Sequence, residues 1–142
     1  MNSSHLTSPT MPVFSCDAMV ADASSYPPSA GKPALVIRDW QAAGLPIEVR
    51  EPEPVAREQL ALARDADFVN DILDDKRRNG FGNILASVAA SLPYTTGAML
   101  SAAREALRNG RVACAPVSGF HHAGYAHAGF KHVICESLGL TY

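Results

Sequence analysis

Three short strand-like runs, two of them apolar and the second alternating apolar with charged residues, constrain the fold of this chain most strongly. They occupy residues 12–16, 47–50 and 112–115. Runs of this length that are bounded by turn-forming residues are typical of β-strands. An order of strand, helix, strand, helices and strand favours parallel strands covered by helices, so we predict an α/β layer fold. Three strands are fewer than a covered parallel sheet normally has, and we expect the sheet to be incomplete.

The segments between these runs carry helical periodicity. Apolar spacing predicts helices over residues 55–64, 68–73 and 98–108. Residues 34–41 fit either a strand or a helix, and we prefer a helix that ends before Gly44 and Pro46. Asp65 stands at the N-cap position before the helix of residues 68–73, and Gly110 follows the last helix as a C-terminal glycine. We expect residues 94–97 to open the last helix. Residues 78–83 are rich in turn formers and predict a loop.

Length and composition exclude several classes of protein. The chain has 142 residues and a formal net charge of −2, which fits one domain without a nucleic-acid footprint. No apolar stretch reaches the roughly 20 residues that a bilayer span needs. The three widely spaced cysteines form neither a disulfide framework nor a zinc motif, so we expect a reducing, cytoplasmic setting. Residues 1–10 read as a disordered polar leader rather than a signal peptide.

Two adjacent histidines, His121 and His122, follow the third of these runs within the segment of residues 116–123. The end of a strand is where α/β enzymes keep their chemistry. Imidazole titrates near neutral pH, so one ring can accept a proton from water while the other donates to a leaving group. A chance pair is the competing interpretation. His127 and His132 have no carboxylate at a helpful spacing, which favours solvated side chains over metal ligands.

The segment Ser118-Gly119-Phe120-His121-His122-Ala123 resembles the tandem-histidine motif of the histone deacetylase superfamily, which includes the acetylpolyamine amidohydrolases. Earlier segments resemble bacterial members in the same order, and the similarity extends over residues 11–129. These supporting segments lie at residues 46–48, 67–69, 79–83 and 92–97. A match of this length is more specific than a six-residue motif.

The resemblance implies a three-layer arginase-like α/β fold and zinc-dependent hydrolysis of an acetyl amide, with Zn²⁺ polarising the carbonyl and activating water. It implies that His122 is the general base and that His121 orients the substrate or protonates its leaving group. Gly119 and Phe120 would shape the floor of the pocket. Phe130 would form a wall of the acetyl channel, and Asn83 would lie on its rim, where many relatives carry an acidic residue. A plain turn is the alternative for residues 79–83.

The family pattern breaks after Gly129. Phe130 arrives about one residue early, and residues 131–142 diverge from the family. The Asp-x-His pair, the later Asp and the tyrosine that would complete the family site are absent from the sequence. We therefore expect residues 11–130 to be the N-terminal part of a deacetylase-like domain, truncated and inactive alone, without tightly bound zinc.

Two other interpretations remain open. The chain can be a non-catalytic binding or regulatory half-domain that dimerises to cover apolar strand edges. It can also be an unrelated metal-free hydrolase, but Ser118 lacks the Gly-x-Ser-x-Gly elbow of a nucleophile. The expected partner is an acetylated lysine or polyamine substrate. We expect neither nucleic acid nor a membrane as a partner. Whether the chain forms a homo-oligomer is left open.

Overall fold

Two short parallel strands form the sheet of this mixed α/β chain. The computed structural model describes residues 10–22, 29–117 and 125–126. Strand β1 (Met11–Phe14) pairs in parallel with β2 (Ile47–Arg50), with Val13 opposite Val49. Both strands were predicted, β1 from its apolar run and β2 from its alternation of apolar and charged residues. The expected leader, residues 1–10, lies outside the described residues except for its last position, and so does the divergent tail, residues 131–142.

The third predicted strand reaches the free edge of β1 through an isolated bridge. Val13 pairs in parallel with Cys114. The Phe14 N–H donates to the Cys114 carbonyl at 2.8 Å, and the Cys114 N–H donates to the Pro12 carbonyl at 2.9 Å. β1 is therefore the central strand, and the missing N–H of Pro12 costs no bond because only its carbonyl is needed.

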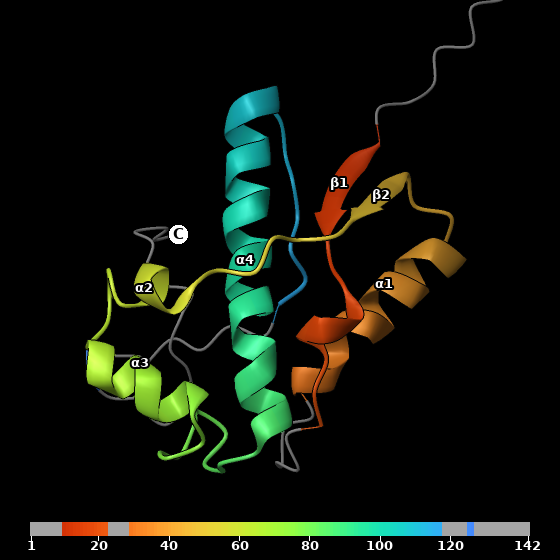
Figure 1. Cartoon of the computed structure of the whole chain (residues 1–142). Coiled ribbons are helices and arrows are strands. Elements are labelled where there is room, and N and C mark those ends of the chain that lie inside the picture. The colour runs from red at the N-terminus through yellow and green to blue at the C-terminus, as the bar shows by residue number, and fades with distance from the viewer. Residues whose placement is uncertain (1–9, 23–28, 118–124, 127–142) are drawn as a thin grey trace, which may run out of the picture.

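Helix α1 (Lys32–Ala42) connects the two strands, as predicted. It begins with Pro33 in its first turn, where a proline sacrifices no helical hydrogen bond. It ends before Gly44, whose φ of 68° lets the chain reverse into β2. The structure places α1 and α4 (Ala86–Asn109) on opposite sides of the strands (Figure 1).

Two smaller helices follow β2. Helix α2 (Arg57–Leu60) is a single turn and shorter than the predicted helix of residues 55–64. Helix α3 (Ala66–Leu73) is confirmed, together with its cap, because the Asp65 carboxylate accepts a hydrogen bond from the Phe68 N–H at 2.8 Å. Both helices lie on the side of α4 that faces away from the strands (Figure 1).

Helix α4 is longer than the predicted helix of residues 98–108, because it begins twelve positions earlier and passes through Pro93. A proline inside a helix removes one backbone hydrogen bond. Here both halves of the helix bury side chains, Val88 and Ala89 before the proline and Ala98 and Ala102 after it. Burial on both sides outweighs the local penalty, so the helix continues. No helix of the described residues has the length and apolarity to cross a bilayer.

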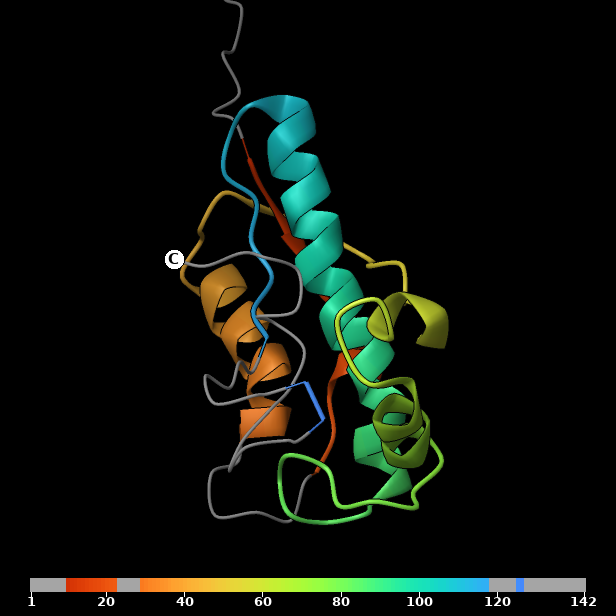
Figure 2. The ribbon, with the colours of Figure 1, turned by 90° about the vertical axis from the view of Figure 1, so that its left-hand side faces the viewer.

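The main core lies between α4 and β1. Phe14, Met19, Ala98 and Ala102 form a buried cluster, and Ala113 and Ala115 pack against it from the third segment. Since Cys114 pairs with Val13, it lies on the opposite face of the sheet from its two alanine neighbours. Figure 2 shows residues 111–117 running beside α4.

Gly97 permits the closest approach of α4 to the chain that leaves β2. A Cβ atom built at Gly97 would overlap the Glu53 carbonyl oxygen and come within 3.1 Å of the Pro54 Cα. The Val55 N–H also donates to the Pro93 carbonyl at 3.1 Å, one helical turn before Gly97. The backbone of residues 53–55 is therefore seated directly on the helix.

Replacing Gly97 by alanine reverses the usual effect of such a change. Gly→Ala inside a helix normally stabilises it by roughly 1 kcal/mol. Gly97→Ala must push two backbones apart, and we expect it to lower the free energy of unfolding by roughly 1–3 kcal/mol. Urea denaturation measures both this variant and the control Ala90→Gly at an exposed position of the same helix, which should lose about 1 kcal/mol. A Gly97→Ala protein more stable than the parent would contradict the close packing.

Candidate functional site

The chain approaches the tandem histidines from the carboxyl edge of the sheet. Residues 112–117 run parallel to β1, and Ala115 and Val117 pack against the core cluster between β1 and α4. Ligands of open α/β sheets bind beyond the carboxyl ends of the strands. Val117, the last described residue before the motif, therefore stands at the edge where the sequence predicts the chemistry.

The next described residue after the motif, Tyr125, is bonded to a different element. Its carbonyl accepts a hydrogen bond from the Asp65 N–H at 3.1 Å. Asp65 is also the residue that caps α3 through its side chain. The two flanks of the motif are thus attached to the core at Val117 and to the start of α3 at Tyr125.

Five of the six predicted site residues lie outside the described residues, so their roles stay predictions. They are Gly119, Phe120, His121, His122 and Phe130. The sixth, Asn83, is described. The structure therefore shows what supports the motif and does not bring the predicted site residues together.

Asn83 closes the loop that precedes α4. Its Oδ1 atom accepts hydrogen bonds from the Asn79 side-chain amide at 2.7 Å and from the Leu85 N–H at 3.1 Å. Asn79 is 5% exposed, and its own Oδ1 accepts from the Phe81 N–H at 2.9 Å. The two asparagines thus stabilise a turn, the alternative that the sequence left open, and the Asn83 oxygen is already engaged.

The Asn83 contacts separate two substitutions of similar size. Asn83→Asp keeps the acceptor oxygen and should change the free energy of unfolding by less than about 0.5 kcal/mol. Asn83→Ala leaves the nearly buried Asn79 amide without this acceptor and should cost roughly 1–3 kcal/mol. Thermal and urea unfolding of both variants measure the difference. Equal stability of the two variants would show that the side-chain oxygen contributes nothing to the turn.

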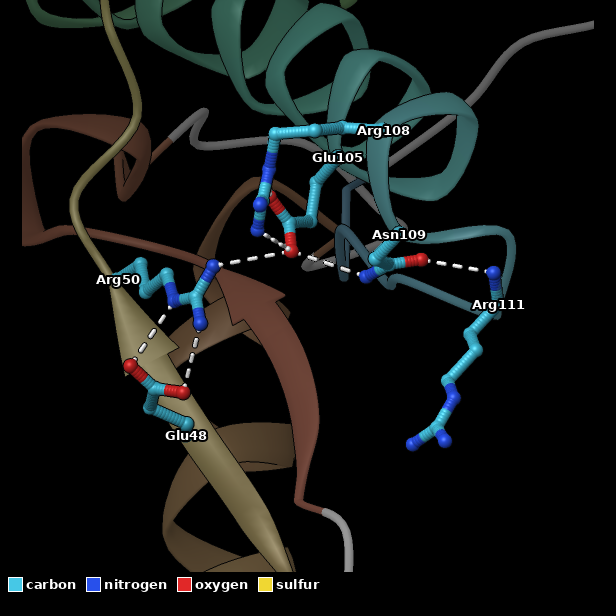
Figure 3. Close-up of polar contacts among 6 residues, drawn as sticks. All are labelled: Glu48, Arg50, Glu105, Arg108, Asn109 and Arg111. Carbon is cyan, nitrogen blue, oxygen red and sulfur yellow. Dashed lines mark hydrogen bonds and ion pairs between the residues drawn. The ribbon is translucent and has the colours of Figure 1, made fainter.

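A cluster of charged side chains, which the sequence did not predict, joins β2 to the last turns of α4. Glu105 lies at its centre (Figure 3). Arg108 donates two hydrogen bonds to its carboxylate, at 2.7 and 2.9 Å, and the Asn109 amide donates a third at 2.9 Å. Arg50 reaches the same carboxylate at 3.2 Å from β2 and forms a bidentate pair with Glu48.

This cluster borders a hollow at the amino edge of the sheet, opposite the edge that leads to the histidines. The hollow is lined by residues that include Thr10, Glu48, Arg50, Glu105, Asn109 and Arg111. Its two carboxylates are both paired with guanidinium groups. The arrangement fixes the end of α4 against β2, and among the described lining residues it leaves no unpaired carboxylate for proton transfer. The only signal of this charged cluster in the sequence was the spacing of Arg108 and Asn109, three and four residues after Glu105.

The hydrogen bonds from Arg108 hold the pKa of the Glu105 carboxyl at about 2, below its ordinary value of 4.5. The Asn109 amide and the charge of Arg50 act in the same direction, and burial opposes them. The depressed pKa means that the folded state prefers the ionised carboxylate. Its contribution to stability is therefore fully present above pH 4.5 and is lost as the pH falls through about 2.

Replacing Glu105 by glutamine should remove part of the acid sensitivity of the protein. We expect Glu105→Gln to melt below the parent at pH 7 and the gap to close between about pH 4.5 and 2, because the parent loses its carboxylate there. Melting curves at five or six pH values measure this. Glu58→Gln, at an exposed position of α2, is the matched control and should show a small gap throughout. A Glu105→Gln gap that persists unchanged at pH 2 would contradict the assignment.

The described residues offer no fit for a catalytic zinc ion. Within residues 10–22, 29–117 and 125–126, no group of three or more His, Cys, Asp or Glu side chains could hold a metal. Burial raises the pKa of the Cys114 thiol and so favours its protonated form.

Comparison with known proteins adds no assignment: no family model matches the chain, and no curated protein is significantly similar to it.

Proposed function

We propose that residues 11–130 form the N-terminal part of a deacetylase-like domain that hydrolyses acetyl amides. The proposal rests on the resemblance of residues 118–123 to the tandem-histidine motif. One structural observation supports it above the others, the parallel placement of Cys114 beside β1. With this placement, the chain enters the motif at the carboxyl edge of a parallel sheet, the edge at which α/β enzymes bind their substrates.

The three-layer arginase-like arrangement is part of the same proposal. α1 and α4 lie on opposite sides of β1 and β2, as a helix-covered parallel sheet requires (Figure 1). Cys114 adds one parallel bridge on the other side of β1. The described strands would then form one portion of a larger central sheet.

Each predicted site residue has one role in this proposal. His122 accepts the proton of the attacking water, and His121 orients the substrate or protonates the leaving amine. Gly119 and Phe120 form the floor of the pocket, and Phe130 a wall of the acetyl channel. Asn83 belongs to the channel rim, although its oxygen already serves the turn. The substrate class is an acetylated lysine or an acetylated polyamine.

Zinc belongs to the family chemistry and is not assigned to this chain. In such enzymes the ion polarises the acetyl carbonyl. The described residues supply no ligand set for it. Because no Asp-x-His pair follows the histidines in residues 123–142, we propose that this stretch of chain lacks hydrolytic activity by itself. Retention of stoichiometric zinc through a purification without chelator would contradict this proposal.

The experiment that tests the family assignment is to read the coding DNA from codon 120 to well past the Tyr142 codon in all three frames. We expect a shifted frame to resume with Gly-Phe-Cys and, later, an Asp-x-His pair. If no frame resumes the pattern, the deacetylase assignment fails and the interpretation as a binding module takes its place.

The protein encoded through the resumed frame gives the chemical test. We expect it to hydrolyse acetyl-lysine peptides or acetylated polyamines, and His122→Ala to lower kcat roughly 10²–10⁴-fold, the usual contribution of a general base. His127→Ala removes a histidine of the same segment that has no role in the proposal and should leave kcat within about twofold of the parent. Equal losses in both variants would overturn the role of His122.

A further inference from the structure

The hollow at the amino edge of the sheet borders one arginine that the charged cluster around Glu105 does not use. Arg111 follows α4, and its guanidinium points away from Glu105 (Figure 3). The Arg111 N–H donates to the Asn109 side-chain oxygen at 2.7 Å, which fixes the backbone at this point. Among the described residues, no acceptor or carboxylate engages the Arg111 guanidinium. A positive charge with unused donors therefore lines the hollow.

The two carboxylates that line the hollow do not neutralise Arg111, because other guanidinium groups already engage them. Glu48 accepts two hydrogen bonds from Arg50, at 2.7 and 2.9 Å. Glu105 accepts two from Arg108 and is paired with Arg50 at 3.2 Å. Two carboxylates and three guanidinium groups leave a formal charge of +1 around the hollow at neutral pH. The balance of charge therefore favours an anion.

Further donors line the same hollow, and the chain that leads to it brings no acid. Arg50 uses three of its five N–H donors on Glu48 and Glu105, so two remain. Thr10 adds a hydroxyl to the lining. Residues 1–9, which precede Thr10, contain neither Asp nor Glu. The neighbouring sequence therefore supplies no side-chain carboxylate for these donors.

We propose that this hollow binds a small organic anion, with a carboxylate or phosphate group on Arg111 and an apolar part against Val112. The planar fork of a guanidinium matches both kinds of oxyanion through two parallel hydrogen bonds. Val112 is 69% exposed and lines the hollow together with Pro12, so an apolar group can cover it there. The hollow has a volume of about 650 Å³, within the usual range of small-molecule sites.

This site is independent of the proposed hydrolysis. The hollow lies at the amino edge of the sheet, whereas residues 112–117 lead to the histidines from the carboxyl edge. Its readout is binding, so its failure would leave the deacetylase assignment untouched. Arg111 is exposed, and a Debye length of about 8 Å at physiological salt screens charges at the surface. Binding is therefore best measured at low ionic strength.

Phenyl phosphate is the probe for this site. As it is titrated into ¹⁵N-labelled protein, we expect the amide shifts of Arg111 and Val112 to move, and Arg111→Gln to weaken binding at least about tenfold. The Arg111 side chain makes no contact among the described residues, so this variant should keep its fold. Arg104→Gln removes an exposed arginine of α4 outside the hollow and should change binding less than about twofold. Absence of binding, or an equal loss in both variants, overturns the proposal.

Three related compounds test the two parts of the ligand. Phenol lacks the charge and should not bind, and inorganic phosphate lacks the ring and should bind at least about threefold more weakly than phenyl phosphate. Val112→Ser should remove the advantage of the ring. Benzoate replaces the phosphate by a carboxylate, and the tighter of the two aromatic anions shows which oxyanion the site prefers. Phenol binding as tightly as phenyl phosphate overturns the role of Arg111, and inorganic phosphate binding as tightly overturns the contact with Val112.

Discussion

The backbone pairing of β1 on both of its edges is the interaction on which the rest of the structure depends. Odd-numbered residues bond to the β2 side, where the Met11 N–H donates to the Pro46 carbonyl and the Ser15 N–H to the Arg50 carbonyl. Even-numbered residues bond to the Cys114 side. Val13, at the centre, has no exposed surface. The approach of α4, the position of the Glu105 cluster and the direction of the chain into the histidines all follow from this strand.

Local sequence pattern was sufficient to predict β1, β2, α1 and the capped α3, whereas the strand predicted over residues 112–115 is reduced to a single bridge at Cys114. A cap such as Asp65, or a glycine such as Gly44, acts within a few residues, so its effect is readable in the sequence. The first residue of α4 could not be predicted from the sequence, because a proline such as Pro93 normally breaks a helix. Only the burial of side chains on either side of it, a tertiary effect, explains why the helix continues.

The candidate site was likewise predictable from the sequence only where local pattern carried the information. The sequence identified the tandem histidines by motif, and the structure supports only the direction from which the chain reaches them. The role of Asn83 in a turn was an open alternative that the hydrogen bonds of its oxygen now favour. The pairing of Arg50 with Glu105 could not be read from the sequence. Its partners lie on β2 and α4, and no local periodicity relates two elements so far apart in the chain.

The position of β1 at the centre of the sheet has a consequence during synthesis on the ribosome. β1 is among the first described residues to be made, and Cys114, which closes its second edge, lies about one hundred residues later. At roughly 5–20 residues per second, that edge stays open for about 5–20 s of translation. Open strand edges attract other chains. The nascent protein therefore has a defined interval in which a chaperone on Met11–Phe14 would be most useful.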